Sequence, residues 1–212
     1  MSRFHLLNRD GQLCLVDRSH PKQQPLIIDF NQPKLRHRAT QGGKKELLLR
    51  AVGVKAGLRV QDWTAGLGTD SLLLATAGCQ VTMFERSRVI AALLKQALNS
   101  KDERLAPVLE RMQLHAGDAR EFPEQPADVI YLDPMFPLVK KTALVNGPMQ
   151  YLQRLLGPDH DAEQLIEAAL GRSVKRVVVK RPVSAPETKA TFVLSAKANR
   201  FDVYELPGAD CS

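Results

Sequence analysis

The chain lacks the features that mark membrane-spanning, secreted and zinc-binding proteins. Its longest stretch without a charged residue, 71–84, has 14 residues, whereas a membrane span needs about 20 predominantly apolar residues. The opening residues, MSRFHLLNRDGQ, have neither the long apolar run nor the cleavage site of a secretory signal. Its three cysteines, Cys14, Cys79 and Cys211, are far apart and form no CxxC pair, which argues against a zinc site and a disulfide framework. We therefore predict a cytoplasmic protein without a membrane span or a metal.

Positive charge is the clearest bias in the composition. The 212 residues include 30 Lys and Arg against 23 Asp and Glu, which gives a net charge of +7. Such a surplus favours an anionic partner, nucleic acid first, although solvated surface lysines would give the same count. The length corresponds to one domain, or to one domain with a modest appendage.

The first 43 residues differ in pattern from the rest of the chain. Residues 4–16 alternate around an Asn-Arg-Asp-Gly cluster, which predicts a β-hairpin. The short apolar run 25–30 predicts a strand, and the basic stretch 34–45 has so few apolar residues that we expect a loop or a surface arm. We therefore divide the chain into an N-terminal β-hairpin and basic arm, 1–43, and a second domain, 44–212.

Helical and strand patterns alternate from residue 44 onward. In order, they indicate a helix ending at Gly53, a strand 58–63, a helix 70–77, a strand 80–84, a helix 88–98 capped by Ser87, strands 112–115 and 127–132, two helices within 140–170 with Asp161 as a cap, a strand 174–179 and a terminal antiparallel hairpin. Such alternation is typical of parallel sheets with helices on both faces. The predicted fold class is α/β: a mostly parallel, doubly wound sheet with a C-terminal antiparallel hairpin and a small N-terminal β appendage.

A glycine-containing turn is the first candidate binding motif. The segment 60–70, VQDWTAGLGTD, ends a predicted strand at Asp62 and opens a helix through Gly66 and Gly68. Glycines let the backbone approach a ligand closely, and the helix N-terminus offers free N–H groups to it. Close packing of strand and helix would also explain them. The turn lacks the third glycine of the dinucleotide pattern G-x-G-x-x-G, and Asp70 puts negative charge where a pyrophosphate would lie.

Acidic residues follow the next two predicted strands. Glu85 ends the strand after the glycine turn, where a carboxylate can accept both hydrogen bonds of a ribose diol. A surface ion pair with Arg86 is the alternative. Asp118 follows the third strand and could accept a hydrogen bond from an adenine amino group, while Gly117 would let the chain pass the ring closely. Gly-Asp is also ordinary turn chemistry.

The segment ADVIYLDPMFP, 127–137, brings a polar motif to the carboxyl end of a buried strand. Methylation of an exocyclic amine needs acceptors that turn its N–H bonds so that the nitrogen lone pair faces the methyl group. Asp133 offers a carboxylate and Pro134 a carbonyl that the proline ring holds in place. Phe136 offers a face for base stacking, worth ~1–3 kcal/mol. A simple Asp-Pro turn with Phe136 in the core is the alternative.

Two classes of enzyme that bind a nucleoside cofactor could carry these sites in this order: nicotinamide oxidoreductases and nucleoside-cofactor transferases. Nicotinamide oxidoreductases are disfavoured by the missing third glycine and by Asp70. A cationic cofactor without phosphate, such as S-adenosyl-L-methionine, suits both features. A third hypothesis is an RNA-binding module without catalysis, which would be expected to lose Asp133 or Glu85, yet both are present.

Four motifs together, DWTAGLGTD (62–70), FER (84–86), HAGD (115–118) and DPMFP (133–137), resemble those of class I S-adenosylmethionine-dependent methyltransferases. With HRATQGG upstream and VVVKRP downstream, the chain is similar to the RsmJ family over about residues 26–204. The resemblance implies a Rossmann-like methyltransferase fold. It also implies methyl transfer from S-adenosyl-L-methionine to the N2 amine of the guanine at position 1516 of 16S ribosomal RNA, free or in the small ribosomal subunit. The alternative is another amine, adenine in nucleic acid or a protein amide, for which Asn/Asp-Pro-Pro-Tyr/Phe is more typical than DPMFP.

The resemblance extends to individual residues. It implies cofactor contacts at Thr69, Asp70, Glu85, Arg86, Gly117, Asp118 and Asp133, which join Asp62, Gly66 and Gly68 of the glycine turn. Thr69 stands where the family leads us to expect a basic residue, and the segment before the first hairpin is shorter than in the family. Asp133 and Pro134 would orient the amine while Phe136 stacks the base. Basic residues expected to bind RNA phosphates are Arg36, Arg38, Lys44, Lys140, Lys141, Lys180 and Arg181.

Overall fold

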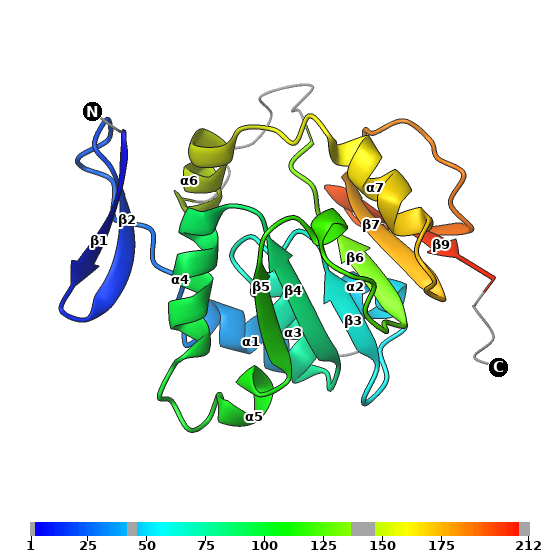
Figure 1. The fold of residues 1–212 in the computed structure, drawn as a ribbon, viewed down its shortest axis with the longest axis horizontal. Coiled ribbons are helices and arrows are strands. Elements are labelled where there is room, and N and C mark those ends of the chain that lie inside the picture. Colours follow the sequence, from blue (N-terminus) through cyan, green and yellow to red (C-terminus); the bar gives the residue numbers. More distant parts are fainter. Residues whose placement is uncertain (1–2, 42–45, 137–146, 208–212) are drawn as a thin grey trace.

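A computed structural model describes residues 3–41, 46–136 and 147–207 of the chain. Its main feature is a seven-stranded sheet in the order β5-β4-β3-β6-β7-β9-β8 (Figure 1). In chain order the strands are β3 (Arg59–Asp62), β4 (Gln80–Glu85), β5 (Met112–Ala116), β6 (Val129–Leu132), β7 (Arg176–Pro182), β8 (Phe192–Ser195) and β9 (Asn199–Glu205). The first five are parallel, and β9 runs antiparallel to both β7 and β8. The predicted mostly parallel sheet and its C-terminal antiparallel hairpin are confirmed.

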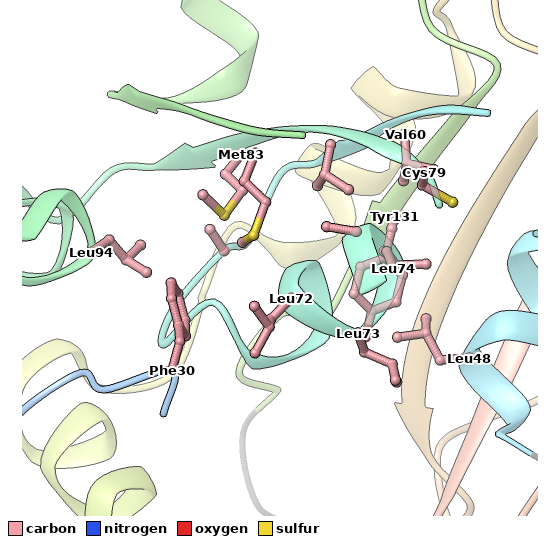
Figure 2. Packing of buried hydrophobic residues seen from close by; sticks show 14 of the residues in the cluster. Phe30, Leu48, Val60, Leu72, Leu73, Leu74, Cys79, Met83, Leu94 and Tyr131 are labelled. Atoms are coloured by element: carbon pink, nitrogen blue, oxygen red, sulfur yellow. The ribbon is translucent and has the colours of Figure 1, made fainter. Parts of the chain in front are cut away.

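Helices cover both faces of this sheet. They are α1 (Pro33–Gln41), α2 (Leu47–Val52), α3 (Thr69–Thr76), α4 (Arg88–Leu98), α5 (Ala106–Leu109), α6 (Gly147–Leu156) and α7 (Ala162–Leu170), with a 3₁₀ turn η2 (Ala119–Glu121). One buried cluster joins α2, α3 and α4 to the sheet, and in Figure 2 Leu73 and Leu74 of α3 lie near Tyr131 of β6. A second cluster joins α7 to the opposite face through Leu165 and Ile166. The doubly wound arrangement is therefore confirmed.

Local sequence explains why these elements begin, end and lie where they do. The β-branched run of β7 is buried on both faces, because Val177, Val178 and Val179 have no exposed surface. Ser87 caps α4, since its Oγ accepts the Ile90 N–H at 3.4 Å. Gly53 ends α2 with a φ of 70°, a left-handed conformation that glycine adopts without strain. Within the described residues, the helices are too short or too polar to cross a membrane.

The predicted N-terminal appendage is a two-stranded hairpin of β1 (Phe4–Arg9) and β2 (Gln12–Asp17). Its turn places Asp10 and Gly11 at φ values of 51° and 81°, as a two-residue hairpin loop requires. Gln96 of α4 ties the hairpin to the main sheet domain: it accepts the Leu13 N–H at 2.6 Å and donates to the Gly11 carbonyl at 2.8 Å. The division at residue 43 stays a prediction, because it falls in a segment that the structure does not describe.

Two predictions for the N-terminal region are wrong. Residues 25–30 do not form a strand; Leu26 makes only an isolated bridge to Leu15, and the run is apolar because Leu26, Ile28 and Phe30 are buried in the main core. The basic stretch is not a loop or arm over its first part, because Pro33–Gln41 is the helix α1. Leu35 packs this helix against the main core, and Arg38 adds contacts to carboxylates of the main domain.

Candidate active site

The carboxyl ends of β3, β4, β6 and β7 surround a cavity of about 570 Å³. The cavity brings together most of the residues that were predicted from separate motifs. Those that line it are Asp62, Gly66, Thr69, Asp70, Glu85, Arg86, Asp118, Asp133, Pro134, Phe136, Lys180 and Arg181. Ligands of doubly wound sheets bind at this edge. Within the described part of the chain, no group of three or more metal-ligating side chains is found.

Glu85 connects the tip of β4 to the glycine turn. Its Oε2 accepts the Gly66 N–H at 2.9 Å, and its Oε1 accepts the Ser87 N–H at 2.7 Å. The residue is only 5% exposed, and burial raises the pKa of its carboxyl. Each carboxylate oxygen can accept more than one hydrogen bond, so the side chain can still receive a ribose diol from the cavity. The glycine turn and Glu85 therefore form one cradle at this side of the cavity.

Two glycines predicted to contact the cofactor do not line the cavity. A Cβ on Gly68 would lie 2.8 Å from Cδ2 of Leu94 and 3.0 Å from Cζ of Phe30. A Cβ on Gly117 would lie 2.9 Å from the ring of Phe122. Packing within the protein therefore explains these two glycines, whereas Gly66 lines the cavity directly.

Asp62 holds the glycine turn through hydrogen bonds. Its carboxylate accepts the Ser71 hydroxyl at 2.5 Å and the Thr64 N–H at 3.0 Å. The side chain is 1% exposed, and burial raises its pKa to about 7. Its hydrogen bonds join both ends of the turn and so hold the backbone that faces the cavity.

The cavity rim beside β4 carries a cluster of arginines and aspartates that the sequence did not predict as a unit. Arg120 donates to Asp118 at 2.5 and 2.9 Å and to Asp161 at 2.6 Å. Arg86 donates to Asp161 at 2.9 Å and also to Asp159. Asp161 is the N-cap residue of α7, as predicted, but its side chain makes no capping hydrogen bond, because its carboxylate binds the two arginines. The Arg120 hydrogen bond holds the pKa of Asp118 below its ordinary value.

Asp159 links this rim to the DPMF motif. Its Oδ2 accepts the Met135 N–H at 2.7 Å, and its own N–H donates to the Met135 carbonyl at 2.8 Å. The Asp-His-Asp run between α6 and α7 was a signal available in the sequence. Its role could not be found there, because its partners Met135 and Arg86 lie far away in the chain.

The DPMF segment is held at both ends of its turn. The Asp133 N–H donates to Thr64 Oγ1 at 2.6 Å, which fixes it against the glycine turn. The Pro134 carbonyl accepts the Phe136 N–H at 2.9 Å and keeps a second lone pair for another donor. Phe136 lines the cavity and packs against the second core cluster.

A network of opposite charges lies behind Asp133. The Lys180 ammonium is 2.7 Å from Asp133 Oδ2 and 3.2 Å from Asp70 Oδ2. Asp70 also accepts the Tyr131 hydroxyl at 2.7 Å and Arg38 Nη1 at 3.0 Å. Burial tends to raise the pKa of Asp70, but Lys180 and Arg38 outweigh it and hold that pKa below its ordinary value. Burial raises the pKa of Asp133 despite the ammonium.

The basic residues predicted to bind RNA fall into three groups. Arg36 is exposed on α1. Lys44, Lys140 and Lys141 lie outside the described residues. Arg38, Lys180 and Arg181 place their charges on carboxylates of the protein: Arg38 on Asp70 and Glu46, Lys180 on Asp70 and Asp133, and Arg181 on Glu163 and Asp202.

The order of this sheet, with a glycine turn, an acid on the next strand and an Asp-Pro motif around one cavity, defines a class I S-adenosylmethionine-dependent methyltransferase. A family described as "Putative SAM-dependent methyltransferase" matches residues 1–206. The ribosomal RNA small subunit methyltransferase J of Aeromonas hydrophila is 46% identical over 97% of this chain and 88% of the relative. That of Dechloromonas aromatica is 45% identical over 85% of this chain and 78% of the relative. The chain belongs to this methyltransferase J family, the RsmJ family that its motifs resemble.

A solved structure gives the same result for the fold. A SAM-dependent methyltransferase from Neisseria gonorrhoeae superposes with a TM-score of 0.72 at 33% identity. The match covers 94% of this chain and 81% of that one. The Rossmann-like methyltransferase fold and the S-adenosylmethionine cofactor expected from the sequence are therefore confirmed.

Proposed function

We propose that this protein transfers a methyl group from S-adenosyl-L-methionine to the N2 amine of a guanine, position 1516, in 16S ribosomal RNA. The observation that carries the proposal is the convergence of Asp133, Phe136 and Glu85 on one cavity. The names of the relatives support a target in the RNA of the small ribosomal subunit. A ribosomal target assigns the activity to the cytoplasm.

The cradle around Glu85 fits the cofactor. Gly66 lines the cavity without a side chain, and the carboxylate of Glu85 faces it with lone pairs to spare. We assign Asp118 to the amine of the cofactor's adenine. Further contacts to the cofactor are assigned to Thr69, Asp70 and Arg86. The residues that support the cradle without contacting the cofactor are Asp62, Gly68 and Gly117. When bound, the cofactor supplies a methyl group on a sulfonium, which is a good leaving group.

Asp133 and Pro134 prepare the amine. The lone pair of a guanine amine is delocalised into the ring, so the amine must be turned before it can attack. The Asp133 carboxylate and the free lone pair of the Pro134 carbonyl accept its two N–H bonds, and Asp133 can take the proton that the nitrogen loses. Phe136 stacks the base, which must leave its own stack to enter the cavity. Positioning of this kind contributes several kcal/mol to catalysis.

Binding of the RNA phosphates requires basic groups. We assign this role to Arg36, which is exposed on α1, together with Lys44, Lys140 and Lys141. Arg38, Lys180 and Arg181 already bind carboxylates, and we propose that they support the site and do not bind RNA phosphates.

The test is labelled methyl transfer to 16S ribosomal RNA and to small subunits from cells without this enzyme, followed by mapping of the modified nucleotide. We expect label at N2 of one guanine. Asp133→Ala should nearly abolish transfer and leave cofactor affinity intact, whereas Glu103→Ala, which removes an exposed carboxylate far from the cavity lining, should change neither. Label on an adenine or a protein amide, or normal turnover by Asp133→Ala, would overturn the proposal.

A further inference from the structure

Lys180 occupies an unusual position for a basic residue of an RNA-modifying enzyme. It belongs to β7, and its side chain is 22% exposed. Its ammonium lies between two carboxylates, 2.7 Å from Asp133 and 3.2 Å from Asp70. An ammonium has three N–H donors, so these two contacts use most of its capacity. Lys180 lines the cavity together with Asp133 and Asp70.

We propose that Lys180 is a positioning residue that keeps the Asp133 carboxylate ionised and turned toward the amine to be methylated. The inference rests on the proposed function, in which Asp133 accepts an N–H bond of that amine. It replaces the expectation that Lys180 binds an RNA phosphate.

The charges around Asp133 explain why such a residue is needed. Asp70, from the start of α3, points an oxygen at the same ammonium, and the Asp62 carboxylate lies beneath the neighbouring turn. Tyr131 of β6 donates to Asp70, and Arg38 of α1 balances the other Asp70 oxygen while it also binds Glu46. Two cations thus face the pair Asp70 and Asp133. Without Lys180, Arg38 would be the cation left to this pair among the described ion pairs, and of the two aspartates it contacts Asp70 and not Asp133.

The ionisation of Asp133 decides its chemistry. An ionised carboxylate only accepts hydrogen bonds, whereas a protonated one donates from one oxygen. A neutral Asp133 could not take the proton that the nitrogen loses, and its O–H would make one of its oxygens a donor toward groups that are themselves donors. Burial already favours the neutral form. The Lys180 ammonium opposes protonation of Asp133 and binds its Oδ2, which leaves Oδ1 of Asp133 to accept an N–H of the amine.

The experiment compares Lys180→Met with Lys175→Met. Lys175 lies just before the opposite end of the same strand, its side chain is 72% exposed, and its ammonium lies 3.6 Å from the Asp128 carboxylate. We would measure kcat and the KM for RNA between about pH 6 and about pH 9. In Lys180→Met, we expect kcat to fall at least ~10-fold near neutral pH and to recover as the pH rises, because the acidic limb of the profile moves up by about one unit or more. Lys175→Met should match the wild type.

Three further readouts separate this role from others. Lys180→Arg should restore the acidic limb, because it restores the cation, even if kcat stays lower. The KM for RNA and its salt dependence should be unchanged in Lys180→Met. Raised KM, a weaker salt dependence and an unmoved acidic limb would overturn the proposal and show a phosphate contact instead. If Lys180→Met does not fold, the same pH profile is measured on Lys180→Gln, and the same shift of the acidic limb is expected.

The outcome is independent of the target's identity. The wild-type profile is recorded on whichever amine the mapping experiment finds labelled. A target other than guanine N2 would contradict the proposed function, whereas an unmoved acidic limb on the true target would contradict the role of Lys180.

Discussion

The Arg181 guanidinium lies 4.8 Å from the centroid of the Phe136 ring. Arg181 is 6% exposed, and Glu163 holds it through two hydrogen bonds of 2.7 and 3.1 Å. Asp202 adds a contact at 3.4 Å. A cation fixed in this way supports the ring from one side while the ring lines the cavity. The ring is thus held as a surface that faces the cavity, where we propose that the target base stacks.

We predict that Phe136→Leu lowers kcat/KM for RNA by roughly 10- to 100-fold, because base stacking on an aromatic ring contributes ~1–3 kcal/mol. Phe136→Tyr keeps the ring and should retain most of the activity. Cofactor affinity, measured by calorimetry, should be equal in all three proteins. If Phe136→Leu turned over RNA like the wild type, the ring would be part of the core and not of the site.

Glu85→Gln should weaken cofactor binding. The substitution removes a charged acceptor for the ribose and sets an amide N–H₂ group against the Gly66 or Ser87 N–H. Loss of one hydrogen bond to a charged group costs about 1.5–3 kcal/mol, which corresponds to a Kd raised roughly 10- to 100-fold. Calorimetry with S-adenosylhomocysteine would measure it. Glu110→Gln, at an exposed residue, is the control; equal affinities in the two variants would contradict the assignment of Glu85.

Gly68→Ala should destabilise the protein more than Gly57→Ala. Both glycines have left-handed φ values, 71° and 76°, but a Cβ on Gly57 meets nothing within 4 Å, while one on Gly68 meets Leu94 and Phe30. Backbone strain alone costs about 1–2 kcal/mol, and overpacking adds about 1–3 kcal/mol at Gly68. Urea unfolding of both variants would measure the difference. Equal losses would show that Leu94 and Phe30 move aside freely.

Much of the sheet could be predicted because its signals are local. The apolar runs of β6 and β7, the Ser87 cap and the glycine after α2 each depend on residues that are neighbours in the chain. The helix α1 could not be predicted in this way. Its Arg38 is held by Asp70, which lies 32 residues further along the chain, and nothing within the basic stretch reveals that partner.

The candidate site shows the same limit. The order of the motifs predicted that Asp62, Glu85 and Asp133 would meet at one sheet edge, and they line one cavity. The ion-pair partner of each charged side chain could not be predicted, because these partners are far apart in the chain and meet only in the folded structure. Lys180 therefore looked like a phosphate ligand in the sequence, whereas the fold sets it between two aspartates.

The buried carboxyl of Asp62 should make folding stability depend on pH. Burial raises its pKa to about 7 in the folded state, whereas an unfolded aspartate titrates near about 3.9. Because the folded state binds the proton more tightly, the stability that Asp62 contributes is fully present below the unfolded pKa and is lost as the pH rises through about 7. Asp62→Asn removes this titration and keeps an oxygen that can accept the Ser71 hydroxyl.

Urea unfolding from pH 4 to pH 8 would measure the effect as the stability of the wild type minus that of Asp62→Asn. We expect this difference to become less favourable to the wild type with rising pH, by at most about 1.4 kcal/mol per pH unit, and to level off above pH 7. Ser71→Ala should extend the loss to higher pH and increase its total, because the Ser71 hydroxyl stabilises the ionised form and its removal raises the folded pKa of Asp62 further. A difference that stays constant, or that grows in favour of the wild type as the pH rises, would mean that the hydrogen bonds from Ser71 and Thr64 outweigh burial and that Asp62 is ionised throughout.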